Sequence, residues 1–285
     1  MASLFARAFL TVLLGAILSG TLVRFAPGFD TDTRQLDVRL SESAIEALKA
    51  ERQREGELGT YYVRFLSGYV TGDLGESSLL NQPVKRLIAE RFAPTFTAVS
   101  GGLVMAWIAA AALAVLAHFF GAPARGLLTA ASGVFLSIPV AVLAFVFLLH
   151  GNGSVQAAAL VVGCAVFPKL AQYLHQLFTR ARSAPHVMTA HARGLSPAVV
   201  FLRHVMAPCL PEIAALAGVS LAFAMSAAIP AEVVLDIPGL GQLAWQAALG
   251  RDLNLLVQLT MLITAVVVFA NALAEWPSLR RRGAQ

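Results

Sequence analysis

Four long stretches of the sequence are almost purely apolar and contain no Asp, Glu, Lys or Arg. Each is long enough, or nearly so, to cross about 30 Å of hydrocarbon as a single α-helix. The whole chain is 58% hydrophobic and only 13% charged, whereas soluble domains are about 25% charged. The sequence therefore predicts an all-α integral membrane protein. The four stretches are residues 96–120, 127–149, 213–229 and 253–273.

Two weaker stretches, residues 8–23 and 155–177, predict further spans and bring the total to about six. The first could be a cleaved signal peptide, but no small-residue cleavage site precedes Arg24, which favours a retained span. The second is interrupted by Pro168 and Lys169. A proline can kink a membrane helix and a lysine can extend its ammonium group towards the interface, so we expect a span here too.

The segment between the first two spans, residues 27–94, has a different composition. Its nine Lys and Arg are outnumbered by eleven Asp and Glu. We predict a soluble excursion that contains one short helix at residues 41–57, with Ser41 as its cap. The chain would then consist of a first span with a short N-terminus at 1–26, the excursion at 27–94 and a transmembrane core at 95–285.

The basic residues predict the orientation of the spans. With six spans both termini lie on the same side of the membrane, and most arginines outside the excursion fall on that side. Because cytoplasmic loops carry an excess of Lys and Arg, we expect both termini and the loop at residues 178–212 in the cytoplasm. This placement also accounts for the net charge of +5 without a nucleic-acid partner. The arginines are Arg7, Arg125, Arg180, Arg182, Arg193, Arg203, Arg280, Arg281 and Arg282.

One functional candidate lies in the cytoplasmic loop, at residues 189–196. The segment predicts two short helices that flank Gly194, a residue that can adopt backbone angles denied to others. Ala190 and Ala192 are small enough to let another surface approach closely. Taken alone, this pattern is also typical of an ordinary basic loop.

A second candidate lies at the outer end of the fifth span, at residues 232–241. Glu232 and Asp236 are functional candidates because carboxylates at the edge of an apolar span are costly unless they are solvated or partnered. Pro238, Gly239 and Gly241 break the helix, and broken backbone at membrane depth is tolerated where it is buried in protein or lines a cavity. A plain exit turn into water remains the alternative.

Taken together, these segments resemble the membrane subunits of the peptide and nickel family of bacterial ABC importers, over nearly the whole chain. The most specific pair is the Ala-Arg-Gly loop at 192–194 with Glu232 and the Pro-Gly-Leu-Gly at 238–241. The other matching elements are Pro27-Gly28, the Gly-Asp-Leu-Gly at 72–75, the Ser-Ile-Pro at 137–139, the Arg-His at 203–204, the Leu-Pro at 210–211 and Arg251-Asp252.

The resemblance implies the type I importer permease fold in the bacterial inner membrane, working by alternating access on peptides or similar small solutes. It implies that the cytoplasmic loop docks on an ATPase subunit, and that two ATPase subunits, a second homologous permease chain in a heterodimer and an extracytoplasmic binding protein are the partners. It places ATP and magnesium on the ATPase subunits, with no cofactor in this chain. The loop residues that it assigns to coupling are Ala190, His191, Ala192, Arg193, Gly194 and Leu195.

Two other classes of protein are compatible with parts of the sequence. An ion-coupled carrier or channel could use Glu232 and Asp236. An intramembrane hydrolase could use His191, His204 and Ser137. Against the hydrolase, the sequence contains neither an HExxH nor a GxSxG motif, and it offers no other metal-binding or catalytic motif. A P-loop needs Gly-Lys-Ser/Thr, which none of the three lysines provides. We therefore expect a non-enzymatic permease whose ATPase is a partner.

Overall fold

The computed structural model describes residues 73–151 and 153–282, with side chains as far as residue 274, and six helical positions near the N-terminus. The six positions are Leu10, Thr11, Leu14, Gly15, Leu18 and Thr21. The expected span at 8–23 is described only there, and the expected excursion helix at 41–57 lies outside the described residues. The total of six spans and the position of the excursion therefore remain predictions.

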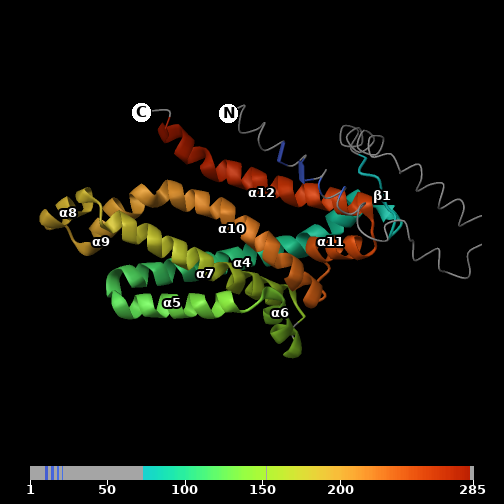
Figure 1. Ribbon diagram of the computed structural model, residues 1–285, viewed down its shortest axis with the longest axis horizontal. Coiled ribbons are helices and arrows are strands. Elements are labelled where there is room, and N and C mark those ends of the chain that lie inside the picture. Colours follow the sequence, from blue (N-terminus) through green and yellow to red (C-terminus); the bar gives the residue numbers. More distant parts are fainter. Residues whose placement is uncertain are drawn as a thin grey trace, which may run out of the picture.

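The described residues form helices and one very short hairpin (Figure 1). The hairpin pairs β1 with β2 in an antiparallel register, Glu76 opposite Pro83 and Ser77 opposite Gln82. The elements in chain order are β1 (Glu76–Ser77), β2 (Gln82–Pro83), α4 (Val84–Phe120), α5 (Ala122–Ser137), α6 (Val140–Leu149), α7 (Val155–Arg182), α8 (Pro185–Ala192), α9 (Pro197–Val200), the π-helical turn η2 (Phe201–Met206), α10 (Ala207–Val234), α11 (Leu240–Leu249) and α12 (Leu253–Arg282).

Four helices in the described part of the chain are long and apolar enough to cross a membrane: Val84–Phe120, Val155–Arg182, Pro197–Val234 and Leu253–Ala274. The predicted spans at 96–120, 155–177, 213–229 and 253–273 each lie within one of them, so these four helices are confirmed. Pro168 does not interrupt α7. Helix α4 begins eleven residues before the expected boundary at 94/95, and it continues through Pro94.

The predicted span at 127–149 is wrong as a single helix. The structure has α5 and α6 instead, which meet at an angle of 85°. Pro139 has no N–H to donate within a helix, and its ring disfavours the helical conformation in the preceding residue. Ile138 is accordingly extended, with φ −93° and ψ 117°. Apolarity alone did not reveal this break, because neither half contains a charged residue between positions 127 and 149.

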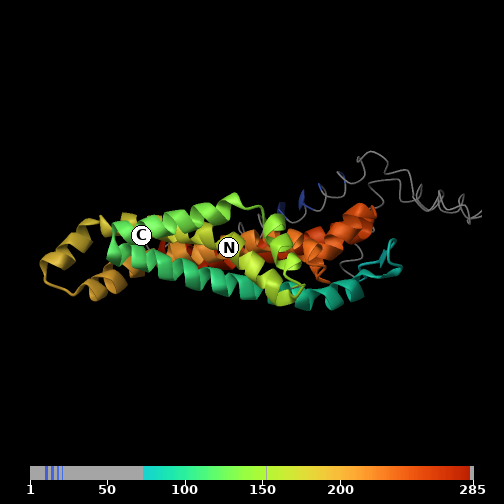
Figure 2. The same cartoon turned by 90° about the horizontal axis from the view of Figure 1, so that it is seen from below.

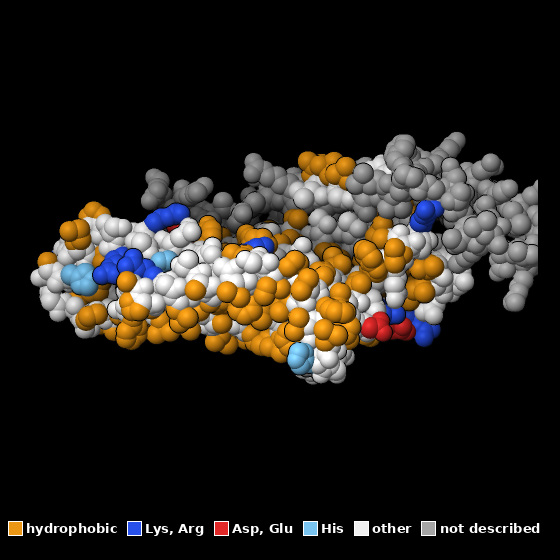
Figure 3. All heavy atoms as spheres, turned by 60° about the horizontal axis from the view of Figure 1, so that its bottom comes forward, with side chains coloured by type: hydrophobic (Ala, Val, Ile, Leu, Met, Phe, Trp, Pro, Cys, Tyr) orange, Lys and Arg blue, Asp and Glu red, His pale blue; other side chains and the backbone are white. Residues whose placement is uncertain are grey.

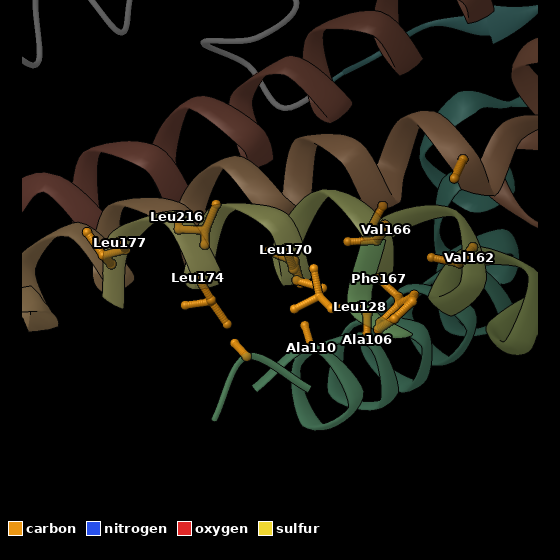
Figure 4. Close-up of a cluster of buried hydrophobic side chains, with 14 of the residues drawn as sticks. Ala106, Ala110, Leu128, Val162, Val166, Phe167, Leu170, Leu174, Leu177 and Leu216 are labelled. Carbon is orange, nitrogen blue, oxygen red and sulfur yellow. The ribbon is translucent and has the colours of Figure 1, made fainter. Parts of the chain in front are cut away.

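The core is built on the contact between α4 and α7, which α5 and α10 cover on either side (Figure 4). Small residues recur at every fourth position along the buried face of α4, which lets the two backbones approach closely. A Cβ added to Gly102 would lie 2.8 Å from the carbonyl oxygen of Ala159 and from a methyl group of Val162. The small residues on this face are Ala98, Gly102, Ala106, Ala110 and Ala114.

The molecule is elongated, and two segments of possible function lie at its opposite ends (Figures 1 and 2). The end that carries α8 and α9 is separated from the end that carries β1 and α11 by the length of the long helices. Hydrophobic side chains dominate the middle of the face in Figure 3, while most charged side chains gather towards the two ends. This distribution fits a membrane-spanning body with two polar ends.

Candidate functional site

The carboxylate of Glu232 lies fully buried between the end of α10 and the start of α11. Its Oε2 atom accepts hydrogen bonds from the backbone N–H groups of Gly241, at 2.7 Å, and Gln242, at 3.2 Å. Its Oε1 atom accepts one from the hydroxyl of Thr95 on α4, at 2.7 Å. The Thr95 oxygen in turn accepts from the N–H of Leu240, at 2.7 Å. Glu232 and Thr95 together form the cap of α11, which we call the carboxylate cap.

The physical reason for this cap is the unsatisfied start of α11. The first N–H groups of a helix have no partner within the helix, and negative charge is stabilised at that end. The residue before α11 is Gly239, which has no side chain that could cap the helix. A carboxylate from the preceding helix and a hydroxyl from α4 supply it instead, which ties three helices together at one point.

Two glycines make room for the carboxylate. A Cβ on Gly239 would overlap the Glu232 carboxylate itself. A Cβ on Gly241 would lie 2.7 Å from the Cα of Ile229 and 2.9 Å from Glu232 Oε2. The two glycines of the Pro-Gly-Leu-Gly sequence are therefore required for the close approach of the Glu232 carboxylate to the start of α11, in addition to any role in breaking the helix.

A more exposed set of polar residues surrounds the cap. The amide of Gln242 donates from Nε2 to Oδ1 of Asp236, at 2.6 Å, and its Oε1 accepts from Arg91 Nη1, at 2.9 Å. Asp236 itself is exposed and has a positive φ of 55°. Pro238 is also exposed. The structure thus separates the two predicted carboxylates, since Glu232 is buried in the cap while Asp236 faces outwards.

A second buried carboxylate, which the sequence analysis missed, lies close to this end. Asp252 accepts from the hydroxyl of Ser77 at 2.6 Å, the N–H of Leu79 at 3.0 Å and the N–H of Leu255 at 3.0 Å. It caps the start of α12 and holds the β1–β2 hairpin against that helix. The signal for it was its position directly before a long apolar run, where Asp is a favoured N-cap residue.

The other predicted segment, at the opposite end, comprises α8, a turn, α9 and η2, and we call it the 185–206 segment. Gly194 lies in the turn with a φ of +75°, so the predicted tight turn is observed. Its N–H donates to the carbonyl of His191, at 2.9 Å, and nothing lies within 4 Å of the place its Cβ would take. The backbone therefore needs glycine at this position, although the space around it is open.

The six loop residues differ in exposure. Ala190 is buried within the chain and packs into the main core, so it anchors α8. His191, Ala192, Arg193, Gly194 and Leu195 are all exposed. Met188, on the same short helix, exposes 68% of its surface. The outer surface of the turn is therefore a mixture of basic and apolar groups that nothing in the described chain covers.

Phe201 fixes the 185–206 segment to the long helices. Its buried ring contacts the rings of His118 and Phe119 at the end of α4, with centroids 4.7 and 5.3 Å away. It also meets Phe178 of α7 edge to face, at 5.3 Å. His186 on α8 bonds through Nε2 to the carbonyl oxygen of His204, at 3.0 Å. These packed rings join the 185–206 segment to α4 and α7.

The histidines and serine considered for hydrolysis are not assembled into a site. Ser137 donates its hydroxyl to the carbonyl of Gly133 within α5. His191 and His204 both lie in the 185–206 segment, on other elements of the chain. Within residues 73–151 and 153–282, no group of three or more His, Cys, Asp or Glu side chains is arranged to hold a metal ion.

Residues 95–282 match a protein family described as the inner membrane component of binding-protein-dependent transport systems. Among curated proteins, the glutathione transport system permease protein GsiC of Pectobacterium atrosepticum is 26% identical over 278 residues, which is 91% of this chain and 87% of that protein. A protein named as a peptide permease from Brucella ovis is 24% identical over 91% of this chain and 90% of its own length. GsiC of an Escherichia coli O6:H1 strain is 25% identical over 96% of this chain and 91% of its own.

Proposed function

Since the chain belongs to the family of inner membrane components of binding-protein-dependent transport systems, we propose that it forms one half of the translocation pathway of an ATP-driven importer for short peptides or similar small solutes. It is a non-catalytic, multi-pass permease subunit of the inner membrane. The observation that carries the proposal is the match of residues 95–282 to the family, with relatives that align over more than 90% of the chain.

The substrate class rests on the relatives. Two are named for glutathione transport and one for peptide transport. Glutathione is itself a small peptide-like molecule, so one class of solute covers both names. The proposal adds two ATPase subunits that bind ATP and magnesium, a second homologous permease chain in a heterodimer, and an extracytoplasmic binding protein that delivers the solute.

The proposed mechanism follows from one continuous helical path. Residues Pro197–Val234 form 38 residues of unbroken helix, about 57 Å long, which join the 185–206 segment to the carboxylate cap. In the proposal, ATPase closure pushes on the exposed turn around Gly194. The push reaches the broken α10–α11 corner, where Asp236, Pro238, Gly239 and Gly241 shape the outer end of the pathway.

The geometry of Glu232 argues against the ion-coupled alternative. Both of its oxygens already accept hydrogen bonds from groups of the chain, and its pocket is closed by Gly239 and Gly241. A carboxylate that couples transport to an ion must exchange these hydrogen bonds for an ion during each cycle. Losing the hydrogen bonds would leave a buried charge without partners, which is costly.

Uptake of a labelled peptide tests the proposed substrate class. Cells that lack their own peptide importers would receive this chain with its neighbouring transport genes, and we expect them to accumulate glutathione or trialanine. The matched control carries the same genes with an inactive ATPase subunit, and it should accumulate neither. Accumulation of sugars but of no peptide by the intact system would contradict the proposal.

The proposed orientation predicts which positions face outwards. Lys85 and Ser183 are both exposed and lie at the two ends of the span region. In a background without Cys164 and Cys209, Lys85→Cys should react in spheroplasts with an impermeant thiol reagent, whereas Ser183→Cys should react only after lysis. The reverse order of reactivity would show that the chain is inserted the other way round.

A further inference from the structure

Lys169 lies at the centre of a membrane-spanning helix. It is about 21 Å along the axis from the start of α7 and about 20 Å from its end. Its side chain is exposed on the described chain, although α7 is the most buried of the four spans, with 67% of its apolar window inside the fold. The ammonium nitrogen lies 4.1 Å from the centroid of the Phe223 ring on α10. Lys169 thus lies about midway between the two ends of α7.

The exposed face of α7 around Lys169 is polar. Tyr173, Gln176 and Arg180 follow it at intervals of three and four residues, which place them on one face of the helix, and each is exposed. Helices α5 and α6 look different, because they expose large apolar side chains such as Val134 and Phe145, and we expect these to face lipid. This stripe runs from the middle of α7 towards its end at Arg182. A polar stripe that begins within a span faces water or another protein chain.

The contact with Phe223 does not compensate Lys169 fully. A cation–π contact offsets only part of the cost of placing a lysine in the middle of a membrane helix. No carboxylate in the described part of the chain forms an ion pair with Lys169. The remaining cost is removed if the ammonium group faces a water-filled path and can bind an anion that passes through it.

We propose that Lys169, with Phe223 as its platform, is a binding station for the carboxylate of a solute during its passage along the α7–α10 face. This inference rests on the proposed function and narrows its substrate to solutes that carry a free carboxylate. The Phe223 ring holds the ammonium group in place from one side and leaves its other donors free. A single ammonium is a point charge with rotatable donors, so it can release the carboxylate again, as a transport pathway requires.

Thiol labelling next to Lys169 tests, without any substrate, whether the surface around this residue is positively charged and open to water. In a background with Cys164 and Cys209 replaced by alanine, Tyr173→Cys lies one turn from Lys169 on the same face. The assembled transporter would be treated with an anionic sulfonatoethyl methanethiosulfonate and with its cationic trimethylammonium counterpart. We expect both to react, with the anionic reagent favoured, and the ratio of the two rates should fall about tenfold when Lys169→Gln is added. Lys169→Arg should keep the ratio.

Two results would overturn the inference. The first is that Tyr173→Cys does not react, as is expected for Val134→Cys on the lipid-facing side of α5. The second is a rate ratio that Lys169→Gln leaves unchanged, which would mean that a carboxylate of the second permease chain already neutralises the ammonium group. Neither result depends on which solute the parent protein imports.

Transport of two peptides that differ only in their carboxylate then tests whether Lys169 binds that group. Import of trialanine should fall about tenfold in Lys169→Gln and recover in Lys169→Arg, whereas import of trialanine amide should not change. An equal loss for both peptides would indicate a structural role and would overturn the inference. If the parent imports neither peptide, the proposed substrate class fails, and the labelling ratios alone decide whether Lys169 faces an aqueous path.

Discussion

Replacing Glu232 by alanine is expected to unfold the outer end of the permease. The substitution removes the acceptor of the Gly241 and Gln242 N–H groups and leaves both buried. Each buried donor without an acceptor costs about 1–3 kcal/mol, so the two together cost about 2–6 kcal/mol. We expect a large loss of monodisperse protein on size-exclusion chromatography after a heating step that the parent survives, and loss of transport.

Graded variants distinguish the cap from a general loss of packing. Thr95→Val removes one hydroxyl and leaves the Leu240 N–H without an acceptor, so its effect should be smaller than that of Glu232→Ala. Thr95→Ser keeps the hydroxyl and should resemble the parent. Gly241→Ala should be destabilising, whereas Gly133→Ala, where nothing lies within 4 Å of the added Cβ, should be neutral. If Glu232→Ala survived the heating step as well as the parent does, the carboxylate cap would not stabilise this end of the protein.

Substitution of Gly194 is expected to reduce transport strongly while leaving the protein folded. Gly194→Glu meets no atom of the chain within 4 Å, so its cost within the chain is backbone strain alone. At a close-packed contact with an ATPase, an oversized side chain costs about 1–3 kcal/mol. We expect uptake to fall about 5- to 150-fold, because each 1.4 kcal/mol changes an equilibrium about tenfold. Gly194→Pro should act similarly, because proline fixes φ near −65°.

Gly151 provides a matched control for this prediction. It has a φ of +70°, and nothing lies within 4 Å of its added Cβ, but it lies between α6 and α7, away from the 185–206 segment. Gly151→Glu therefore carries the same strain without touching the proposed ATPase contact. Parental uptake by Gly194→Glu at equal abundance would remove the coupling role from this segment.

The apolar runs were sufficient to predict most of the helical core. Residues 96–120 and 253–273 fall inside single helices because their length and lack of charge permit little else in a membrane. The 85° bend before Pro139 was missed, since hydropathy carries no information on direction. The early start of α4 was also missed, because Lys85, Arg86 and Glu90 gave its first turns the composition of a soluble segment.

The candidate site was predictable only in part. Glu232 stood out because a carboxylate near an apolar run needs a partner. That partner, Thr95, lies 137 residues away in sequence, and no local pattern connects the two. Gly194 was identified from its turn chemistry, and its φ of +75° agrees. The burial of Ala190 could not be seen, because which side of a short helix faces the core depends on Phe201 and the ends of α4 and α7.

Reconstitution shows whether this chain couples ATP hydrolysis by partner subunits to solute import. The permease pair and its ATPase subunits would be placed in liposomes with loaded binding protein on the outer-facing side, and ATP would be supplied to the ATPase side. We expect peptide accumulation that requires ATP, is strongly reduced in Gly194→Glu and is unaffected by dissipating the proton and sodium gradients. Accumulation by the permease chains alone, driven by an ion gradient and independent of ATP, would contradict it.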